Sequence, residues 1–269
     1  MNPHNRVVIL TGASAGIGAA TARAFAAAGA RLVLAARSHE PLERLAAALP
    51  GALAVPADVS DPGQCRALVE AAVSRHGQVD LLINNAGVGL AGPVATLASA
   101  DLERALAVDM FGPLWLMQAV APLMRAQGQG QIINVSTVLA EQPLPYLGGY
   151  AAAKAALERL SEAMRMELRG TGVRVTVVRP GSTRTGFSGH RLGAGREVRR
   201  VAPRGVPPEA VARTILRAAH REPARAYVTM GDRVGIWAAR LVPGLVESLL
   251  SRVIAWDHTA EPEQERRLP

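Results

Sequence analysis

The chain has 269 residues, of which 49% are hydrophobic and 19% charged, so it can bury a core and is not mostly disordered. A single cysteine, Cys65, excludes a disulfide scaffold and a metal site built from cysteines. The formal net charge is +8, and of the 30 basic residues only Lys154 is a lysine.

The start of the chain runs directly into an apolar segment without the charged, apolar and small-residue pattern of a secretory signal. No uninterrupted apolar run approaches the roughly 20 residues that a membrane helix needs. We therefore expect a protein of the reducing cytoplasm.

Short β-branched runs alternate along the chain with longer alanine-rich stretches of helical period. Strands are predicted at 6–11, 31–36, 53–56, 79–84, 131–136, 173–178 and 226–230, and helices at 16–29, 40–49, 62–76, 99–126, 147–169, 207–221 and 234–255. Strands that are apolar on both faces and separated by helices indicate a parallel sheet covered on each side. The pattern predicts an α/β fold: one domain over residues 1–256 with a Rossmann-type, doubly wound sheet of about seven strands.

The segment Thr11-Gly-Ala-Ser-Ala-Gly-Ile-Gly18 joins the first predicted strand to the first helix. Its glycines permit positive φ and remove Cβ atoms, so that backbone amides can approach a pyrophosphate at the helix N-terminus. An ordinary strand–helix turn is the alternative. The expected cofactor-binding residues here are Gly12, Ser14, Gly16, Ile17 and Gly18.

The end of the second strand decides which dinucleotide is expected. An acidic residue there would accept hydrogen bonds from the adenosine ribose, but the chain has Ala36 followed by Arg37. A guanidinium can pair with a 2′-phosphate, so we predict NADP(H) in preference to NAD(H). The alternative is that Arg37 is one of 29 unremarkable arginines.

Tyr150-Ala-Ala-Ala-Lys154 lies in a strongly helical segment, and the i, i+4 spacing places both side chains on one face. A cation about 4 Å from a phenol contributes roughly 4 kcal/mol at an effective dielectric of about 20, or some three pKa units. One lysine can therefore lower the pKa of a tyrosine from about 10 to near 7, where general acid–base catalysis is efficient. A surface tyrosine and lysine on an amphipathic helix is the alternative.

At this point the chain resembles the short-chain dehydrogenase/reductase family, in its single-domain branch. The matching motifs are Thr11–Gly18, Asn84-Asn-Ala-Gly87, Tyr150-x-x-x-Lys154 and Pro180-Gly-Ser-Thr-Arg-Thr185. They occur in the family's order and spacing over residues 6 to about 185, and the C-terminal third matches only in outline.

The resemblance implies hydride transfer between a nicotinamide and a carbonyl carbon, with Tyr150 passing the proton and Lys154 holding the nicotinamide ribose. It also implies a homodimer or homotetramer that pairs through the helices carrying Asp109 and Tyr150. Further cofactor contacts are implied beside the adenine (Asp58, Val59), along the adenosine (Asn85, Ala86, Gly87) and at the nicotinamide (Pro180, Gly181, Thr183, Thr185).

Two positions depart from the family pattern. The serine that usually stands thirteen residues before the tyrosine is Thr137 here, with Ser136 beside it. Successive strand residues point to opposite faces, so both hydroxyls cannot enter the site of a regular strand. The family's spacing to the tyrosine implies that Thr137, rather than Ser136, is the hydroxyl that steadies the substrate oxygen. The second departure is Asp109, where the family has asparagine; its carboxylate could alter the proton relay near Lys154, or it could form an ordinary helix contact.

The remaining segments carry weaker predictions. Residues 186–205 are expected to form a substrate lid, or else a plain loop, and residues 257–269 a flexible tail. The segment 232–256, which Pro243-Gly244 breaks, is expected to pack against the domain or a partner subunit, with an interfacial membrane helix as the minor alternative. The six histidines have no ligand spacing, so no metal is expected.

Residues 190–225 contain nine arginines and three glutamates. The simplest interpretation is a solvated helix face plus a loop, although such a patch can hold nucleic acid, anionic lipid or an acidic substrate. No lysines or aromatic residues are interleaved with these arginines, so nucleic acid is not expected.

These residues predict an NADP(H)-dependent oxidoreductase that interconverts a ketone and a secondary alcohol of an apolar substrate. A non-catalytic NAD(P)-binding sensor would not need the tyrosine, the lysine and a hydroxyl together. An epimerase acting on sugar nucleotides would need a longer substrate domain and a different glycine spacing.

Overall fold

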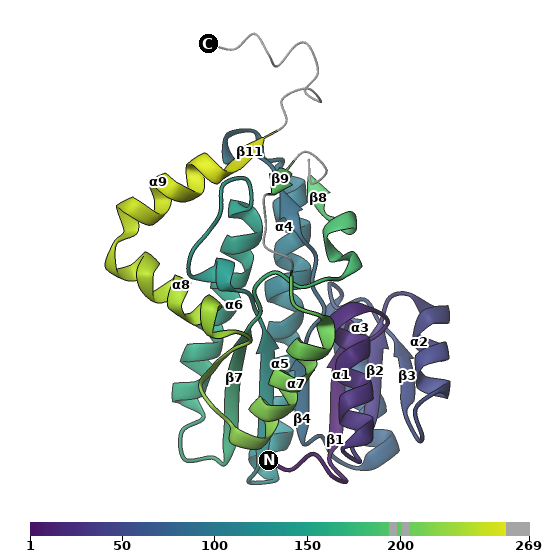
Figure 1. Ribbon diagram of the computed structural model, residues 1–269. Helices are drawn as coiled ribbons and strands as arrows, with labels where there is room; N and C mark the ends of the chain where they lie inside the picture. The colour runs from purple at the N-terminus through teal and green to yellow at the C-terminus, as the bar shows by residue number, and fades with distance from the viewer. Residues whose placement is uncertain (194–197, 201–204, 257–269) are drawn as a thin grey trace.

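The computed structural model describes residues 1–193, 198–200 and 205–256 (Figure 1). Its main sheet has seven parallel strands in the order β10-β7-β6-β4-β1-β2-β3, which confirms the predicted fold. The strands are β1 (Val7–Thr11), β2 (Arg31–Ala36), β3 (Leu53–Pro56), β4 (Leu81–Asn84), β6 (Gly130–Val135), β7 (Val173–Arg179) and β10 (Arg225–Tyr227). Because all of them are parallel, their carboxyl ends meet at one edge of the sheet.

The strand β1 shows why the sequence forms a sheet that is covered on both faces. All five of its residues are buried. Val8 and Leu10 point into one hydrophobic core, and Val7 and Ile9 point into the other. Successive side chains of the strand point to opposite faces of the sheet, and here the side chains on both faces are apolar. Both faces must therefore be covered by helices.

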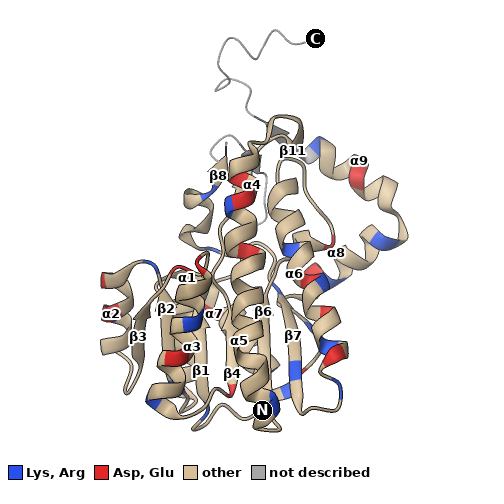
Figure 2. Ribbon diagram, turned by 180° about the vertical axis from the view of Figure 1, so that it is seen from behind, with Lys and Arg blue, Asp and Glu red and all other residues tan. Residues whose placement is uncertain are grey.

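The helices form the two outer layers (Figures 1 and 2). One core is completed by α1 (Gly16–Ala27), α2 (His39–Ala47) and α7 (Pro208–Arg221), and the other by α3 (Pro62–His76), α5 (Gly112–Ala126) and α6 (Gly148–Glu167). Fully buried side chains such as Phe25 and Ile215 contribute about 1.5–3 kcal/mol each to the stability of these layers. On α7 the arginines Arg213, Arg217 and Arg221 are exposed, which matches the solvated helix face expected for that part of the basic segment.

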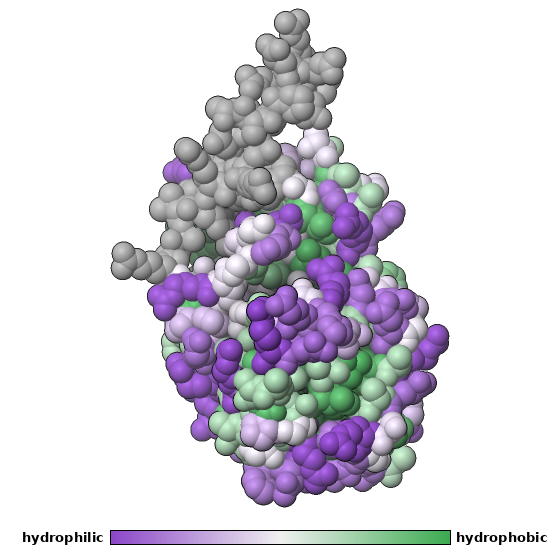
Figure 3. Space-filling model, turned by 90° about the vertical axis from the view of Figure 1, so that its right-hand side faces the viewer, coloured by the Kyte–Doolittle hydropathy of each residue, from purple (hydrophilic) through white to green (hydrophobic). Residues whose placement is uncertain are grey.

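The outer edge of the sheet is less well covered. The apolar residues 53–55 of β3 are only half buried. Figure 3 views the molecule from this side and shows hydrophobic residues in patches among hydrophilic ones on the lower body. This edge therefore lacks the continuous cover that the central strands have.

The predicted helix over 99–126 consists of three segments. They are α4 (Ser99–Leu106), the π-helical segment η2 (Ala107–Phe111) and α5, which together are long and apolar enough by length and composition to cross a membrane. The α5 side chains Leu116 and Val120 are fully buried in the core, so this helix is a core helix of the sheet. The widened turn η2 carries Asp109, and such turns often occur at functional sites.

The C-terminal segment differs in its bounds from the helical stretch predicted over 234–255. It begins four residues earlier as α8 (Met230–Leu241), bends by 117° into α9 (Pro243–Val253), and ends as β11 (Ile254–Trp256). The bend falls at Pro243, which cannot donate the backbone hydrogen bond that a continuous helix requires. The start at Met230 also shortens the predicted last strand, which ends at Tyr227.

This C-terminal segment packs on the domain through only part of its surface. Ile236 and Ala239 are buried, whereas Trp237 is 57% exposed and Leu241 73% exposed. The expected packing against the domain is therefore met on one face of α8. β11 pairs antiparallel with β9 (Val198–Arg200), which attaches the end of the segment to the region expected to be the lid.

The expected lid is described in part. After β7 the chain forms the 3₁₀ helix η4 (Gly186–His190) and then β8 (Leu192–Gly193), which pairs with β5 (Leu90–Ala91). Residues 194–197 and 201–204 of the expected lid, and the expected tail 257–269, lie outside the described residues.

Candidate active site

The loop between β1 and α1 has the backbone that a pyrophosphate needs. Gly12 and Gly16 have φ of +64° and +52°, a region that L side chains rarely adopt. A Cβ at Gly12 would lie 2.8 Å from Ala86 Cα, and one at Gly18 would lie 1.9 Å from Gly12 O. In the described structure no side chain caps α1 and no acidic residue occupies its first turn. Its first amides thus fit an anionic ligand.

The loop after β4 is tied directly to this glycine loop. Thr11 Oγ1 accepts hydrogen bonds from the amides of Asn85 and Ala86, both at 3.0 Å. Asn85 Nδ2 in turn donates to Thr11 O at 2.9 Å. A Cβ at Gly87 would meet Asp109 Oδ1 at 2.8 Å and Lys154 Nζ at 3.3 Å. The motif 84–87 therefore lies between the glycine loop and the proposed catalytic residues.

The expected adenosine contacts lie at the ends of β2 and β3. Arg37 is exposed directly after the buried Ala36. Asp58 Oδ1 accepts from the Ser60 amide at 2.9 Å and from the Ser60 hydroxyl at 2.7 Å, which fixes the carboxylate. Val59 is buried, and a Cβ added at Gly112 would lie 2.5 Å from the Val59 carbonyl oxygen. In the glycine loop, Ser14 and Ile17 are half buried.

Tyr150 and Lys154 lie one turn apart on α6, as predicted. Lys154 is 3% exposed, and Nζ donates to Val135 O at 3.2 Å. The same ammonium pairs with Asp109 Oδ1 at 3.1 Å. The Tyr150 ring packs against Phe187 of η4, with ring centroids 5.9 Å apart. The lysine is thus held in place by two oxygen atoms from different elements.

Asp109 is fully buried and forms the acidic half of this pair, which is more specific than an ordinary helix contact. Oδ1 also accepts from the Val88 amide at 3.1 Å, while Oδ2 is buried without a hydrogen-bond partner among the described residues. Burial raises the pKa of Asp109, and the ammonium of Lys154 opposes that rise. The departure from asparagine therefore places a second charge beside the only lysine.

The two candidate hydroxyls follow directly after β6. Thr137 is 7% exposed, and its Oγ1 accepts from the Leu139 amide at 3.3 Å, which caps the short 3₁₀ helix η3 (Val138–Ala140). That bond leaves the hydroxyl proton of Thr137 for another acceptor. The Ser136 hydroxyl is buried without a hydrogen-bond partner in the described part of the chain.

The turn after β7 faces the glycine loop. A Cβ at Gly16 would lie 3.2 Å from Thr185 Cγ2. Thr183 forms an isolated parallel β-bridge with Val206, and its hydroxyl donates a hydrogen bond to Gly181 O at 3.2 Å. Pro180 is buried at the start of this turn. The turn therefore lies where the resemblance places the nicotinamide.

Three groups near the site were missed by sequence reasoning. Phe187 covers Tyr150, and Arg191 lies half buried against Gly89, where burial lowers its pKa. The third group is a buried network around Arg179, at the end of β7. A charged residue that ends an apolar strand run was the only signal of it in the sequence.

Comparison with known proteins agrees with this geometry. A family model described as short chain dehydrogenase matches residues 6–192. Dehydrogenase/reductase SDR family member 7B of Bos taurus is 32% identical over 267 residues, which cover 92% of this chain and 81% of the relative.

Two solved structures are similar over almost their whole length. The short chain dehydrogenase/reductase from Burkholderia phymatum in complex with NAD is 26% identical with a TM-score of 0.82, covering 91% of this chain and 96% of that one. The short chain dehydrogenase from Burkholderia cenocepacia J2315 in complex with NADP is 28% identical with a TM-score of 0.79, covering 93% and 99%. The chain therefore belongs to the short-chain dehydrogenase/reductase family and is an NAD(P)-dependent oxidoreductase.

Proposed function

We propose that the protein interconverts a ketone and a secondary alcohol with NADP(H), and that its substrate is apolar around the reacting carbonyl. The observation that carries this proposal is the Tyr150–Lys154 pair, anchored on α6 beside Gly87 and close to the glycine loop. A non-catalytic nucleotide-binding sensor has no need of a fixed, buried ammonium one turn from a tyrosine.

A bound nicotinamide supplies or accepts the hydride at the carbonyl carbon. Tyr150 donates the proton to the carbonyl oxygen in reduction and removes it from the alcohol in oxidation. Thr137 donates a hydrogen bond from its hydroxyl to the same oxygen, without giving up its proton, and stabilises the charge that develops there. Lys154 favours the phenolate through its charge and holds the nicotinamide ribose.

The preference for NADP(H) rests on Arg37. Its side chain is exposed at the carboxyl end of β2, and no ion pair occupies it within the described residues. A free guanidinium at that place can pair with a 2′-phosphate in a bidentate manner. The ratio of kcat/KM for NADPH over NADH should therefore fall on Arg37→Ala. Arg44→Ala is the control, because Arg44 is exposed on α2 and paired with Glu40.

The apolar character of the substrate is supported by Phe187, which packs over Tyr150 and is 38% exposed. Assembly into a homodimer or homotetramer is supported by the stacked rings of Phe111 and Trp115, 5.7 Å apart, of which Phe111 is 40% exposed. A substrate bound beside Phe187 would extend along the segment that carries η4 and β8, which we propose as its lid.

NADPH oxidation with a panel of apolar ketones tests the reaction. The unmodified protein should turn over at least one ketone, and Tyr150→Phe should reduce kcat by orders of magnitude while NADPH still binds. NADPH binding without turnover of any ketone or alcohol would favour the sensor. Efficient turnover by Tyr150→Phe would remove the tyrosine from the mechanism.

A further inference from the structure

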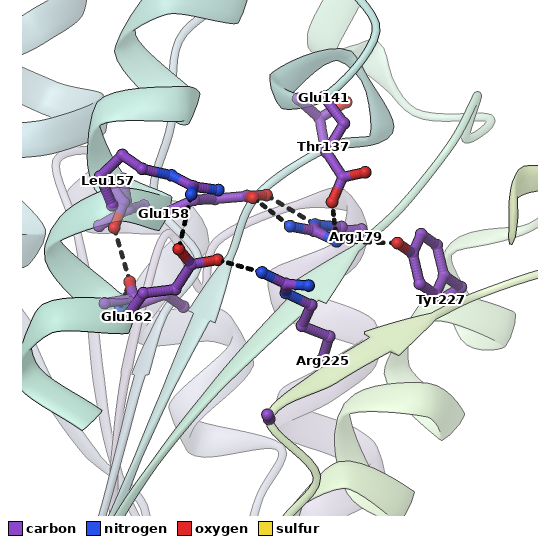
Figure 4. A network of polar contacts seen from close by, with 12 residues as sticks. Thr137, Glu141, Leu157, Glu158, Glu162, Arg179, Arg225 and Tyr227 are labelled. Carbon is purple, nitrogen blue, oxygen red and sulfur yellow. Dashed lines mark hydrogen bonds and ion pairs between the residues drawn. The ribbon is translucent and has the colours of Figure 1, made fainter. Parts of the chain in front are cut away.

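A polar network around Arg179 lies in the interior, and the proposed reaction makes no use of it (Figure 4). Arg179 is the last residue of β7 and is 0% exposed. A guanidinium is tolerated out of water only where charged and hydrogen-bonding groups surround it. Figure 4 shows these groups to be Glu158, Glu141 and the hydroxyl of Tyr227, which accepts from Arg179 Nη1 at 2.8 Å.

The first carboxylate lies on the helix of the tyrosine and the lysine. Glu158 follows Lys154 by one turn of α6, so Tyr150, Lys154 and Glu158 share one face of the helix. The Glu158 carboxylate accepts from Arg179 Nε at 2.9 Å and from Nη2. This bidentate pair fixes α6 to the end of β7.

The second carboxylate lies on the segment of the proposed hydroxyl. Glu141 comes four residues after Thr137, directly after the single turn η3, and pairs with Arg179 Nη1. The start of the same turn is fixed by Val138, whose amide donates to Pro180 O at 3.1 Å. Both ends of the turn that follows Thr137 are therefore fastened to the end of β7.

The charges of this network balance. Glu141 Oε2 also pairs with Arg240 of α8 at 2.9 Å, so two carboxylates meet two guanidiniums. An apolar cluster of the same size could serve stability alone at least as well, because burying ions is costly. What the ionic arrangement adds is direction, since a bidentate guanidinium fixes the angle as well as the distance of its partners.

We propose that Arg179 is a positioning residue for catalysis, acting through Glu141 to hold the turn that orients the Thr137 hydroxyl. The proposal rests on the role proposed above for Thr137. Without the pairs that Glu141 makes with Arg179 and Arg240, the hydrogen bonds found at the far end of this turn among the described residues are local ones, from Glu141 N to Val138 O at 3.2 Å and from Gln142 N to Val138 O at 3.1 Å. Hydrogen bonds of so short a helix hold it weakly. Thr137 would then leave the geometry in which it can donate to the substrate oxygen.

Glu141→Gln tests this directly, because glutamine keeps the size of the side chain and removes its charge. We expect kcat for ketone reduction to fall about tenfold, less than the 10²–10³ typical of losing the donor itself, with the KM for NADPH unchanged. Glu141→Asp should recover part of the loss. Glu162→Gln is the matched control, since Glu162 lies on α6 and pairs with Arg225 and Arg159 away from Thr137.

The double variant Thr137→Ala/Glu141→Gln isolates the coupling. If Glu141 acts through Thr137, the double variant should be no slower than Thr137→Ala alone. All of these variants should still unfold cooperatively on heating. The positioning proposal is overturned if the two losses multiply, or if Thr137→Ala is slow while Glu141→Gln keeps the unmodified kcat. A fast Thr137→Ala variant would instead show that the role of Thr137 is wrong, and this inference would fall with it. Arg179→Lys keeps the charge but cannot reach Glu141 and Glu158 together, so its kcat for ketone reduction should also fall, and an unchanged kcat in this variant would count against the positioning role.

Discussion

Replacing Asp109 by asparagine should lower the pKa that governs the pH dependence of catalysis. Lys154 Nζ lies 3.1 Å from Asp109 Oδ1, so the carboxylate offsets part of the charge that the lysine presents to Tyr150. Asparagine keeps an oxygen acceptor for the Val88 amide and for Nζ, and it has nearly the same volume. The substitution therefore changes the charge of the site with little change in its shape.

The size of the shift follows from Coulomb's law. At an effective dielectric of about 20, an ammonium about 4 Å from a phenol oxygen stabilises the phenolate by about 4 kcal/mol, and a carboxylate beyond that ammonium, about 7 Å from the same oxygen, would oppose this by about 2.4 kcal/mol. The second quantity corresponds to about 1.7 pKa units. Asp109→Asn should lower the apparent pKa by roughly that amount.

The assay is the pH profile of kcat/KM for ketone reduction with NADPH. Reduction needs the protonated phenol, so its rate falls as pH rises through the apparent pKa, and in Asp109→Asn that fall should begin at lower pH. Burial raises the pKa of Asp109, so its carboxylate takes up a proton at higher pH than a free aspartate, and the two profiles should converge in acid. Glu103→Gln, an exposed change on α4, should leave the profile unmoved. An apparent pKa that stays constant or rises in Asp109→Asn would refute the reasoning.

Further predictions concern the hydroxyls, the thiol and the core. Thr137→Ala should reduce kcat by about 10²–10³ and Ser136→Ala by little, measured by steady-state kinetics; the reverse order would exchange their roles. Burial raises the pKa of the Cys65 thiol to about 11, so native protein should resist alkylation at neutral pH until denaturant exposes the thiol; rapid alkylation of folded protein would contradict its burial. Phe25→Ala should cost about 3–5 kcal/mol of unfolding free energy in urea titrations, because its ring is fully buried, and a loss below 1 kcal/mol would contradict its place in the core.

Much of the fold was accessible from the sequence because its signals are local. Buried β-branched runs separated by helical periods predicted all seven strands of the main sheet to within a few residues. The helix α3 begins and ends at the predicted residues, since Pro62 is a strong start signal and Gly77 a strong stop signal in the backbone. The glycine positions of the first loop followed from the same backbone sterics, and their positive φ values agree with them.

The sequence also placed Tyr150 and Lys154 on one face of one helix, because a period of 3.6 residues needs no knowledge of the rest of the chain. It gave no means of finding the widened turn that buries Asp109 against the lysine, since the apolar period through 99–126 is the same with or without it. The break at Pro243 was visible, but the direction in which α9 leaves α8 was not.

What the sequence by itself determined is thus the order of strands and helices and the identity of the motifs at their ends, which depend on residues within a few positions of one another. Only the tertiary structure decided which arginine would be buried. Among the residues whose burial is described it is Arg179, whose partners Glu141 and Glu158 lie 38 and 21 residues away in the sequence. Such pairings depend on how β6, β7 and α6 come together in space. A local pattern can state that a buried charge needs a partner, but packing chooses the partner.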